Sequence, residues 1–216
     1  TKAASSFDHP NICTIHEIGK TEDDQLFIAM ACYEGETLKK KLENGPIKID
    51  EAIDIVTQVA EGLNRAHQKG IIHRDIKPSN IIVAMEGDKP VPKVIDFGIA
   101  KAMRLRLTDK TMFTQQGQLI GTPEYMSPEQ ADLNDKKIDT RTDVYSLGVV
   151  LYELLAGTLP FAPESLREAG FGEIQRIIKE DSPPRPSTKL SSLGDEAIKV
   201  AQSRKTEITT LVRLLN

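Results

Sequence analysis

The spacing of hydrophobic side chains changes along the chain and predicts strands first and helices afterwards. Two short strand-like runs, 12–18 and 26–32, flank the polar stretch 19–24, which favours a β-hairpin. Thr37 is suited to cap a short helix that ends near residues 44–46. Residues 50–70 repeat apolar side chains at helical spacing, with Asp50 as the expected N-cap and Gly70 as the stop.

The second half of the chain is predicted to be mainly helical. Residues 143–155 are apolar on nearly all sides, which is typical of a helix at the centre of a domain. This run contains Glu153 and is too short to span a bilayer, so no membrane segment is expected in this chain. Further helices are expected over residues 164–179, with an interruption at Gly170 and Gly172, and over residues 195–215. The proline-rich segment 182–187 cannot be regular helix.

Composition narrows the class of protein. The residues are 39% hydrophobic and 28% charged, a composition that excludes a disordered chain. The length of 216 residues suffices for one large domain or two small ones. The formal net charge is −4 without a long block of one sign, so a nucleic-acid partner is not expected. The two cysteines, Cys13 and Cys32, do not form a C-x-x-C pair and are interpreted as two buried, reduced thiols of a cytoplasmic protein.

A polar loop carries the residues with the clearest chemistry. It lies between the apolar residues 71–72 and 81–83, and it holds Asp75, Lys77 and Asn80. A carboxylate can accept a proton from an attacking hydroxyl, an ammonium group can neutralise a phosphate oxygen, and an amide oxygen can help to hold Mg²⁺. These groups suit phosphoryl transfer. Taken alone, the loop could also be a solvated turn that combines them by chance, so further motifs are needed.

Four separate motifs occur in the order found in protein kinases. They are His-Arg-Asp with a following asparagine at 73–80, Asp-Phe-Gly at 96–98, Gly-Thr to Pro-Glu at 121–129, and Asp-Val-Tyr-Ser-Leu-Gly at 143–148. With these motifs the chain resembles bacterial serine/threonine protein kinases of the eukaryotic (Hanks) type. The resemblance implies an α+β fold of the protein-kinase type, mostly the helical C-lobe together with the last strands of the N-lobe.

The resemblance also implies a division of the chain. Residues 1–32 would be a remnant of the N-lobe, 33–36 the hinge, 37–181 the C-lobe, and 182–216 a proline-rich linker with a helical extension or insertion. The glycine-rich loop, the strand lysine and its glutamate partner do not occur in the sequence, nor does the late arginine that pairs with the glutamate matching Glu129. We therefore expect a fragment of a longer kinase that leaves Glu129 unpaired and has little activity by itself.

The catalytic roles of the family carry over to the residues that match its motifs. Asp75 would be the base that orients the substrate hydroxyl, and Lys77 would touch the transferring phosphate. Asn80 and Asp96 would hold the Mg²⁺ ions that bridge the ATP phosphates, with Mn²⁺ as an alternative metal. Taken alone, Asp96 is better interpreted as a turn aspartate before a glycine.

The adenine site is inferred from the same resemblance. Met30 matches the residue at the back of the ATP pocket, and Ala31 and Tyr33 would offer backbone groups to adenine. Leu38 and Ile82 would pack against the adenine ring. Ordinary core packing is the alternative for all five residues, and the sequence alone favours it for Leu38 and Ile82.

Structural roles are implied for a further set of residues. His73 and Phe97, together with Ile15, resemble members of the apolar stack that links the two lobes, and Gly98 completes the Asp-Phe-Gly motif. Asp143 resembles the aspartate that hydrogen-bonds the backbone of the catalytic loop.

Residues 99–120 lack helical periodicity and are expected to form an activation loop. Thr114 is the first candidate for phosphorylation, followed by Thr108, Thr111 and Thr122, and plain loop hydroxyls are the alternative. Arg74 would pair with the phosphate. Autophosphorylation of this loop would require self-association of two copies.

Three functions stay open. An ATP-dependent kinase that phosphorylates serine or threonine in protein substrates is favoured. A kinase-like binding or scaffold module without phosphotransfer is the alternative. A small-molecule phosphotransferase is disfavoured because residues 121–129 resemble the peptide-positioning loop of protein kinases.

Overall fold

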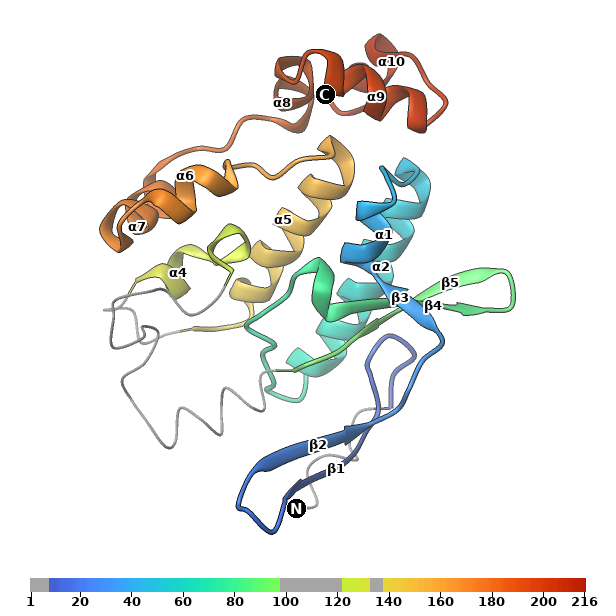
Figure 1. Cartoon of the computed structure of the whole chain (residues 1–216), viewed down its shortest axis with the longest axis vertical. Coiled ribbons are helices and arrows are strands. Elements are labelled where there is room, and N and C mark those ends of the chain that lie inside the picture. Colours follow the sequence, from blue (N-terminus) through green and yellow to red (C-terminus); the bar gives the residue numbers. More distant parts are fainter. Residues whose placement is uncertain (1–7, 98–121, 133–137) are drawn as a thin grey trace.

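The computed structural model describes residues 8–97, 122–132 and 138–216, and it confirms an α+β fold (Figure 1). The strands are β1 (Ile15–Lys20), β2 (Leu26–Met30), β3 (Gly35–Thr37), β4 (Ile81–Glu86) and β5 (Lys89–Val94). The helices are α1 (Leu38–Glu43), α2 (Ile49–His67), α4 (Pro128–Ala131), α5 (Arg141–Ala156), α6 (Pro163–Glu168), α7 (Phe171–Glu180), α8 (Pro186–Ser192), α9 (Asp195–Ser203) and α10 (Ile208–Leu214). Two short 3-10 helices cover Pro78–Asn80 and Pro123–Tyr125.

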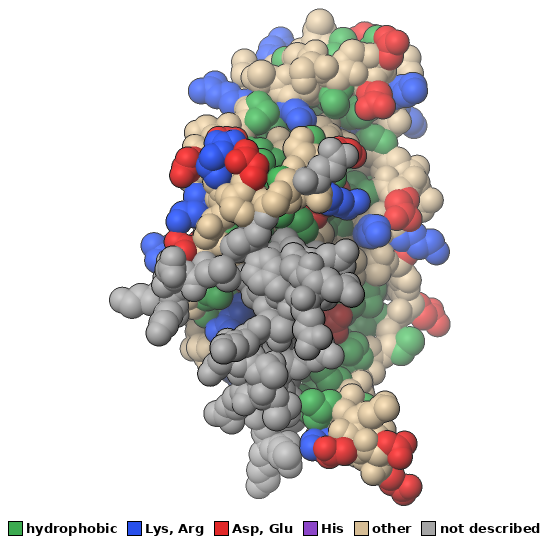
Figure 2. Space-filling view, turned by 60° about the vertical axis from the view of Figure 1, so that its left-hand side comes forward, with side chains coloured by type: hydrophobic (Ala, Val, Ile, Leu, Met, Phe, Trp, Pro, Cys, Tyr) green, Lys and Arg blue, Asp and Glu red, His purple; other side chains and the backbone are tan. Residues whose placement is uncertain are grey.

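The predicted hairpin is confirmed as the antiparallel pair β1–β2, which forms one end of the molecule (Figure 1). Strand β1 begins at Ile15 rather than at residue 12, because the chain before it pairs with β5 instead. Ile12 forms a parallel bridge with Val94, whose carbonyl accepts the Cys13 N–H at 2.9 Å. Acidic side chains gather at the hairpin end in the space-filling view (Figure 2).

A second sheet has the order β3-β4-β5 and supports the start of the helical part. Gly35 of β3 lies so close to β4 that a Cβ atom there would come within 2.4 Å of the Val83 carbonyl oxygen, so glycine is required for this pairing. The next element, α1, has the predicted cap, because the Thr37 hydroxyl accepts the Lys40 N–H at 3.2 Å.

The main hydrophobic core lies between α2, α5 and the second sheet. Ile55 and Val59 of α2, Val150 of α5 and Val94 of β5 are all completely buried in it. The prediction that Asp50 caps α2 is wrong: the helix begins at Ile49, and Asp50 lies in its first turn. There the carboxylate can still interact favourably with the positive end of the helix dipole.

The C-terminal helices α8, α9 and α10 pack around a separate small core that includes Leu190, Val200 and Leu211. A proline-rich segment precedes them, but helix α8 starts within it, because Pro186 occupies its first turn, where proline is tolerated. The prediction of helical structure over 195–215 is confirmed, with two helices in this range. Helix α9 ends at Ser203, and Lys205 has a φ of +54°, outside the helical region.

Arg204 joins this C-terminal unit to the main core. Its guanidinium donates to the carbonyl oxygens of Ile47 (3.0 Å), Leu155 (2.6 Å) and Leu154 (2.5 Å). The last two carbonyls lie in the final turn of α5, where helix carbonyls lack partners within the helix and a cation is favourable. Burial lowers the pKa of Arg204 from its ordinary value.

None of the helices in the described part of the chain combines the length and the apolar character that crossing a bilayer needs.

Candidate active site

The predicted catalytic residues meet on the loop between α2 and β4. Lys77 Nζ lies 3.0 Å from Asp75 Oδ2, and Asn80 Nδ2 lies 3.2 Å from the same oxygen and 2.8 Å from the Asp75 carbonyl. Lys77 Nζ also lies 3.4 Å from the Thr122 hydroxyl. The structure therefore places an ammonium group and an amide against the same carboxylate.

Asp143, at the start of α5, fixes the backbone of this loop through hydrogen bonds. Its side chain is completely buried, and its two oxygens accept the backbone N–H of His73 at 2.8 Å and of Arg74 at 2.7 Å. His67 Nε2 lies 2.7 Å from Oδ2. The contact to the Arg74 N–H also supports an unusual conformation, because Arg74 has a φ of +67°.

The ring of His73 is a completely buried link between the catalytic loop and the chain after β5. Nδ1 accepts the Asp75 N–H at 3.2 Å, so the proton of the neutral ring lies on Nε2 and is donated to the Ile95 carbonyl at 2.8 Å. The ring also packs against Phe97, with centroids 4.8 Å apart. Burial lowers the pKa of His73 from its ordinary value, while the Ile95 carbonyl and the charge of Asp143 act in the opposite direction.

This lowered pKa predicts a loss of stability in weak acid. Below the ordinary histidine pKa of about 6.5, the unfolded chain takes up a proton that folded His73 does not, so the free energy of unfolding falls as pH falls, by at most ~1.4 kcal/mol per pH unit from this group. Urea unfolding from pH 7.5 to 5.5 should show a smaller slope for His73→Gln than for the unchanged protein. The exposed control His16→Gln should keep the full slope, and equal slopes for all three would contradict the assignment.

The two predicted metal ligands lie at the same end of the β4–β5 hairpin. Ile81 of β4 pairs with Val94 of β5, and the Ile95 N–H donates to the Asn80 carbonyl at 3.0 Å. Asn80 therefore lies just before the start of β4, and Asp96 lies two residues after the end of β5, at the same end of the hairpin. Asp96 is exposed, and its φ of +58° turns the chain sharply at this point.

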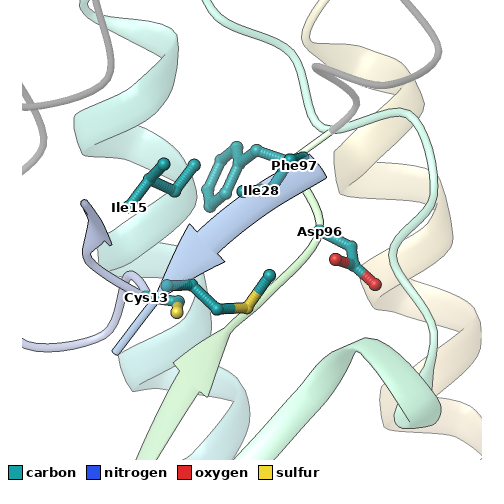
Figure 3. Close-up of a pocket in the computed structure, with 6 residues that line it drawn as sticks. Cys13, Ile15, Ile28, Asp96 and Phe97 are labelled. Atoms are coloured by element: carbon teal, nitrogen blue, oxygen red, sulfur yellow. The ribbon is translucent and has the colours of Figure 1, made fainter. Parts of the chain in front are cut away.

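Beside Asp96 lies a small pocket lined by Cys13, Ile15, Ile28, Met30, Asp96 and Phe97 (Figure 3). The Phe97 ring lies beside Ile15 and Ile28, whereas the Asp96 carboxylate points away from them. Met30 thus lines a pocket next to a predicted metal ligand. The sequence did not predict Cys13 and Ile28 as pocket residues; the alternation along β2, which places Ile28 on the face of Met30, is the signal that could have found Ile28. The prediction that both cysteines are buried is confirmed for Cys13 and wrong for Cys32, which is exposed.

The other residues predicted to contact adenine differ in their surroundings. Ala31 and Tyr33 are partly buried in the link between β2 and β3, and the Tyr33 hydroxyl accepts the Thr14 N–H at 3.1 Å. Ile82 is partly buried on β4. Leu38 is completely buried in the main core, so the structure gives its expected adenine contact no support.

Four residues of the predicted Asp-Phe-Gly motif and activation loop lie outside the described residues: Gly98, Thr108, Thr111 and Thr114. Arg74 Nε is buried and has no hydrogen-bond partner among the residues that the structure describes.

Glu129 was expected to lack its arginine partner, and in the structure its carboxylate accepts the Thr142 hydroxyl at 2.6 Å. This hydrogen bond joins helix α4 to helix α5.

A larger pocket adjoins the catalytic loop and contains residues that the motifs had not singled out. It has a volume of about 520 Å³ and reaches from Lys77 and Thr122 to Glu124, Glu153 and Arg167. Only the fold brings these residues together, because Glu153 of α5 and Arg167 of α6 follow Lys77 by 76 and 90 positions.

Comparison with known proteins agrees with this fold and site. The protein kinase domain family matches residues 1–213, and the chain belongs to that family. It is 41% identical over 212 residues to the serine/threonine-protein kinase pkn3 of Myxococcus xanthus, 44% over 167 residues to PrkC of Bacillus subtilis, and 39% over 199 residues to PknB of Mycobacterium leprae. These alignments cover 94%, 76% and 90% of the chain. These three relatives are bacterial serine/threonine protein kinases of the Hanks type.

The chain spans 37%, 24% and 30% of the lengths of these three relatives. Among solved structures, a double mutant of the PknI kinase domain of Mycobacterium tuberculosis superposes with a TM-score of 0.64 at 24% identity, covering all of this chain and 75% of that one. The unmutated PknI kinase domain gives a TM-score of 0.62 at 23% identity, covering 99% and 75%. These likenesses support the fold.

Proposed function

We propose that this chain is part of the catalytic domain of an ATP-dependent protein kinase that transfers the γ-phosphate to serine or threonine hydroxyls. The observation that carries the proposal is the contact of Asp75, Lys77 and Asn80 on a loop pinned by the buried carboxylate of Asp143. Phosphoryl transfer depends on positioning and on charge neutralisation, and this arrangement supplies both.

The roles follow from the contacts of each group. The Asp75 carboxylate orients the acceptor hydroxyl and takes its proton. Lys77, held 3.0 Å from that carboxylate, neutralises charge on the transferring phosphate. Asn80 directs its NH₂ group to Asp75, while its amide oxygen lies 3.4 Å from the Ser79 hydroxyl and could hold a metal.

The donor set suits Mg²⁺, with Mn²⁺ as an alternative. The described residues contain no group of three or more His, Cys, Asp or Glu able to hold a metal by themselves. Mg²⁺ bound with a nucleotide takes only one or two protein oxygens and completes its shell with phosphate oxygens and water. Asp96 and Asn80 can supply those protein oxygens, and the metal would neutralise the phosphate charge.

The larger pocket favours a protein substrate. It is lined by Lys77, by Glu124 and Tyr125 of the turn, and by Glu153 near the end of α5, so it continues from the transfer site and has a volume of about 520 Å³. We further propose that the kinase acts in the cytoplasm and that two copies associate for autophosphorylation at a threonine of the segment before Thr122.

Transfer of radiolabel from [γ-³²P]ATP tests the proposal. The full-length protein with Mg²⁺ should label a mixed protein substrate on serine and threonine, and EDTA should abolish the labelling. Asp96→Asn should lower the rate by roughly 10²-fold or more and raise the Mg²⁺ concentration needed, since a preorganised charge partner is lost. Asp88→Asn, in the exposed turn between β4 and β5, should leave both unchanged. Label on tyrosine only, or none at all, would refute the proposal.

A further inference from the structure

Lys93 of β5 is a cation that the fold places almost out of contact with water. Its side chain is only 9% exposed, and its Nζ lies 2.8 Å from Glu86 Oε1, whose side chain is 59% exposed. Removing an ammonium group from water is costly unless other groups compensate for its lost hydration, and an ion pair with a largely exposed carboxylate contributes little. The burial of Lys93 therefore calls for a further partner.

The aromatic ring of Tyr33 is that partner. Lys93 Nζ lies 5.2 Å from the centroid of the Tyr33 ring, within the distance of about 6 Å at which a cation is attracted to the face of a ring. Lys93 is also paired with Ile82 across β4 and β5, and opposite residues of an antiparallel pair point to the same face of the sheet. Lys93 thus neighbours both Ile82, which is expected to pack against adenine, and the predicted hinge segment 33–36.

The other end of the Tyr33 side chain is fixed to the chain before β1. The Thr14 N–H donates to the Tyr33 hydroxyl at 3.1 Å, and the Thr14 carbonyl accepts the Ala31 N–H at 2.9 Å. One residue earlier, the Cys13 N–H donates to the Val94 carbonyl at 2.9 Å. The Tyr33 side chain therefore connects the link after β2 to the chain before β1 through its hydroxyl and to β5 through its ring.

We propose that Lys93 is a positioning residue for the nucleotide: its buried ammonium group holds the Tyr33 ring against β5 and so keeps the hinge backbone where Ala31 and Tyr33 can bind adenine. The inference rests on the proposed function and deepens it, because it assigns a role in nucleotide affinity to a residue that lies outside the four kinase motifs. Lys93 should have little influence on the transfer step itself, since the catalytic loop is fixed by separate hydrogen bonds to Asp143.

Binding of a fluorescent ADP that carries a methylanthraniloyl group on its ribose tests this role in the full-length protein with Mg²⁺. Lys93→Met keeps most of the side-chain volume and removes the charge, so the dissociation constant should rise about fivefold, equivalent to ~1 kcal/mol for one cation–π contact in a buried site. Lys93→Arg keeps a cation that can lie over the ring and should restore the affinity to within about twofold. Lys89→Met, an exposed change on the same strand, should leave the affinity unchanged.

Steady-state phosphorylation separates a positioning role from a general loss of folded protein. In Lys93→Met, the KM for ATP should rise about fivefold while kcat at saturating ATP changes less than about twofold, because only nucleotide binding is weakened. A fall in kcat with an unchanged KM for ATP and an unchanged ADP affinity would overturn the inference.

Tyr33→Leu tests the same contact without changing the buried lysine. It should weaken ADP binding by itself, and Lys93→Met added to it should have little further effect, because the ring through which the cation acts is gone. An equal loss of affinity from Lys93→Met with and without the ring would show that the lysine does not act through Tyr33, and the inference would fail.

ADP binding also distinguishes this inference from the proposed function. Weaker ADP binding by Lys93→Met, together with no phosphate transfer by the unchanged protein, would support the positioning role and refute the kinase function. Phosphate transfer by the unchanged protein, with equal ADP affinity in that protein and in Lys93→Met, would support the kinase function and refute the positioning role.

Discussion

Replacement of Asp75 by asparagine should lower kcat for protein phosphorylation by about 10³-fold, within the range lost when a positioned general base is removed. Asparagine keeps the shape of the side chain and can still accept the hydrogen bond from Asn80 Nδ2, now 3.2 Å from Asp75 Oδ2. It cannot take a proton from the substrate hydroxyl, and it removes the negative charge 3.0 Å from Lys77 Nζ.

The measurement is steady-state phosphorylation by the full-length protein at saturating ATP and Mg²⁺. Because Asp75 acts on the acceptor hydroxyl, the KM for ATP should change less than threefold while kcat falls. Asp88→Asn, which makes the same chemical change in an exposed turn, should retain the full rate. A variant at Asp75 with more than a tenth of the original kcat would show that this carboxylate is not the base.

The catalytic loop was readable from the sequence because its chemistry is local. Asp75, Lys77 and Asn80 lie within six positions, so any compact loop keeps them close together, and the short helix Pro78–Asn80 does so here. The hairpin β1–β2 was predicted for a similar reason, since two strands joined by a short polar turn pair with each other.

Two features could not be predicted from the sequence, because each depends on segments far apart in the chain. They are the two carboxylates of the larger pocket and the contacts of Arg204 that hold the C-terminal helices. Glu124 and Glu153 lie twenty-nine positions apart, and neither the turn nor the helix α5 has a pattern that marks the other as its neighbour. Arg204 reaches the carbonyl of Ile47 across 157 positions. A backbone carbonyl has no signature in the sequence, so contacts of this kind appear only once the fold is known.

Removal of the Asp143 side chain should have the largest effect on stability. In Asp143→Ala, two backbone N–H groups, of His73 and Arg74, lose their acceptors at 2.8 and 2.7 Å, and His67 loses a partner at 2.7 Å. A buried donor left without an acceptor costs ~1–3 kcal/mol, so we expect the free energy of unfolding to fall by about 3–5 kcal/mol. This is a large part of the total stability of ordinary domains, about 5–15 kcal/mol.

Urea unfolding of the full-length protein followed by circular dichroism measures this loss, with Asp23→Ala, in the exposed hairpin turn, as the matched control that should change stability by less than ~0.5 kcal/mol. Asp143→Asn separates folding from catalysis, because its amide oxygen can satisfy one of the two N–H groups while its NH₂ group faces the other. It should therefore unfold at an intermediate urea concentration and yet lose phosphotransfer nearly as fully as the alanine variant, since Asp75 follows directly after the two residues that Asp143 holds. Full activity in a folded Asp143→Asn protein would mean that the loop keeps its shape without this carboxylate, and that the contacts of Asn80 and of the His73 ring suffice to position Asp75.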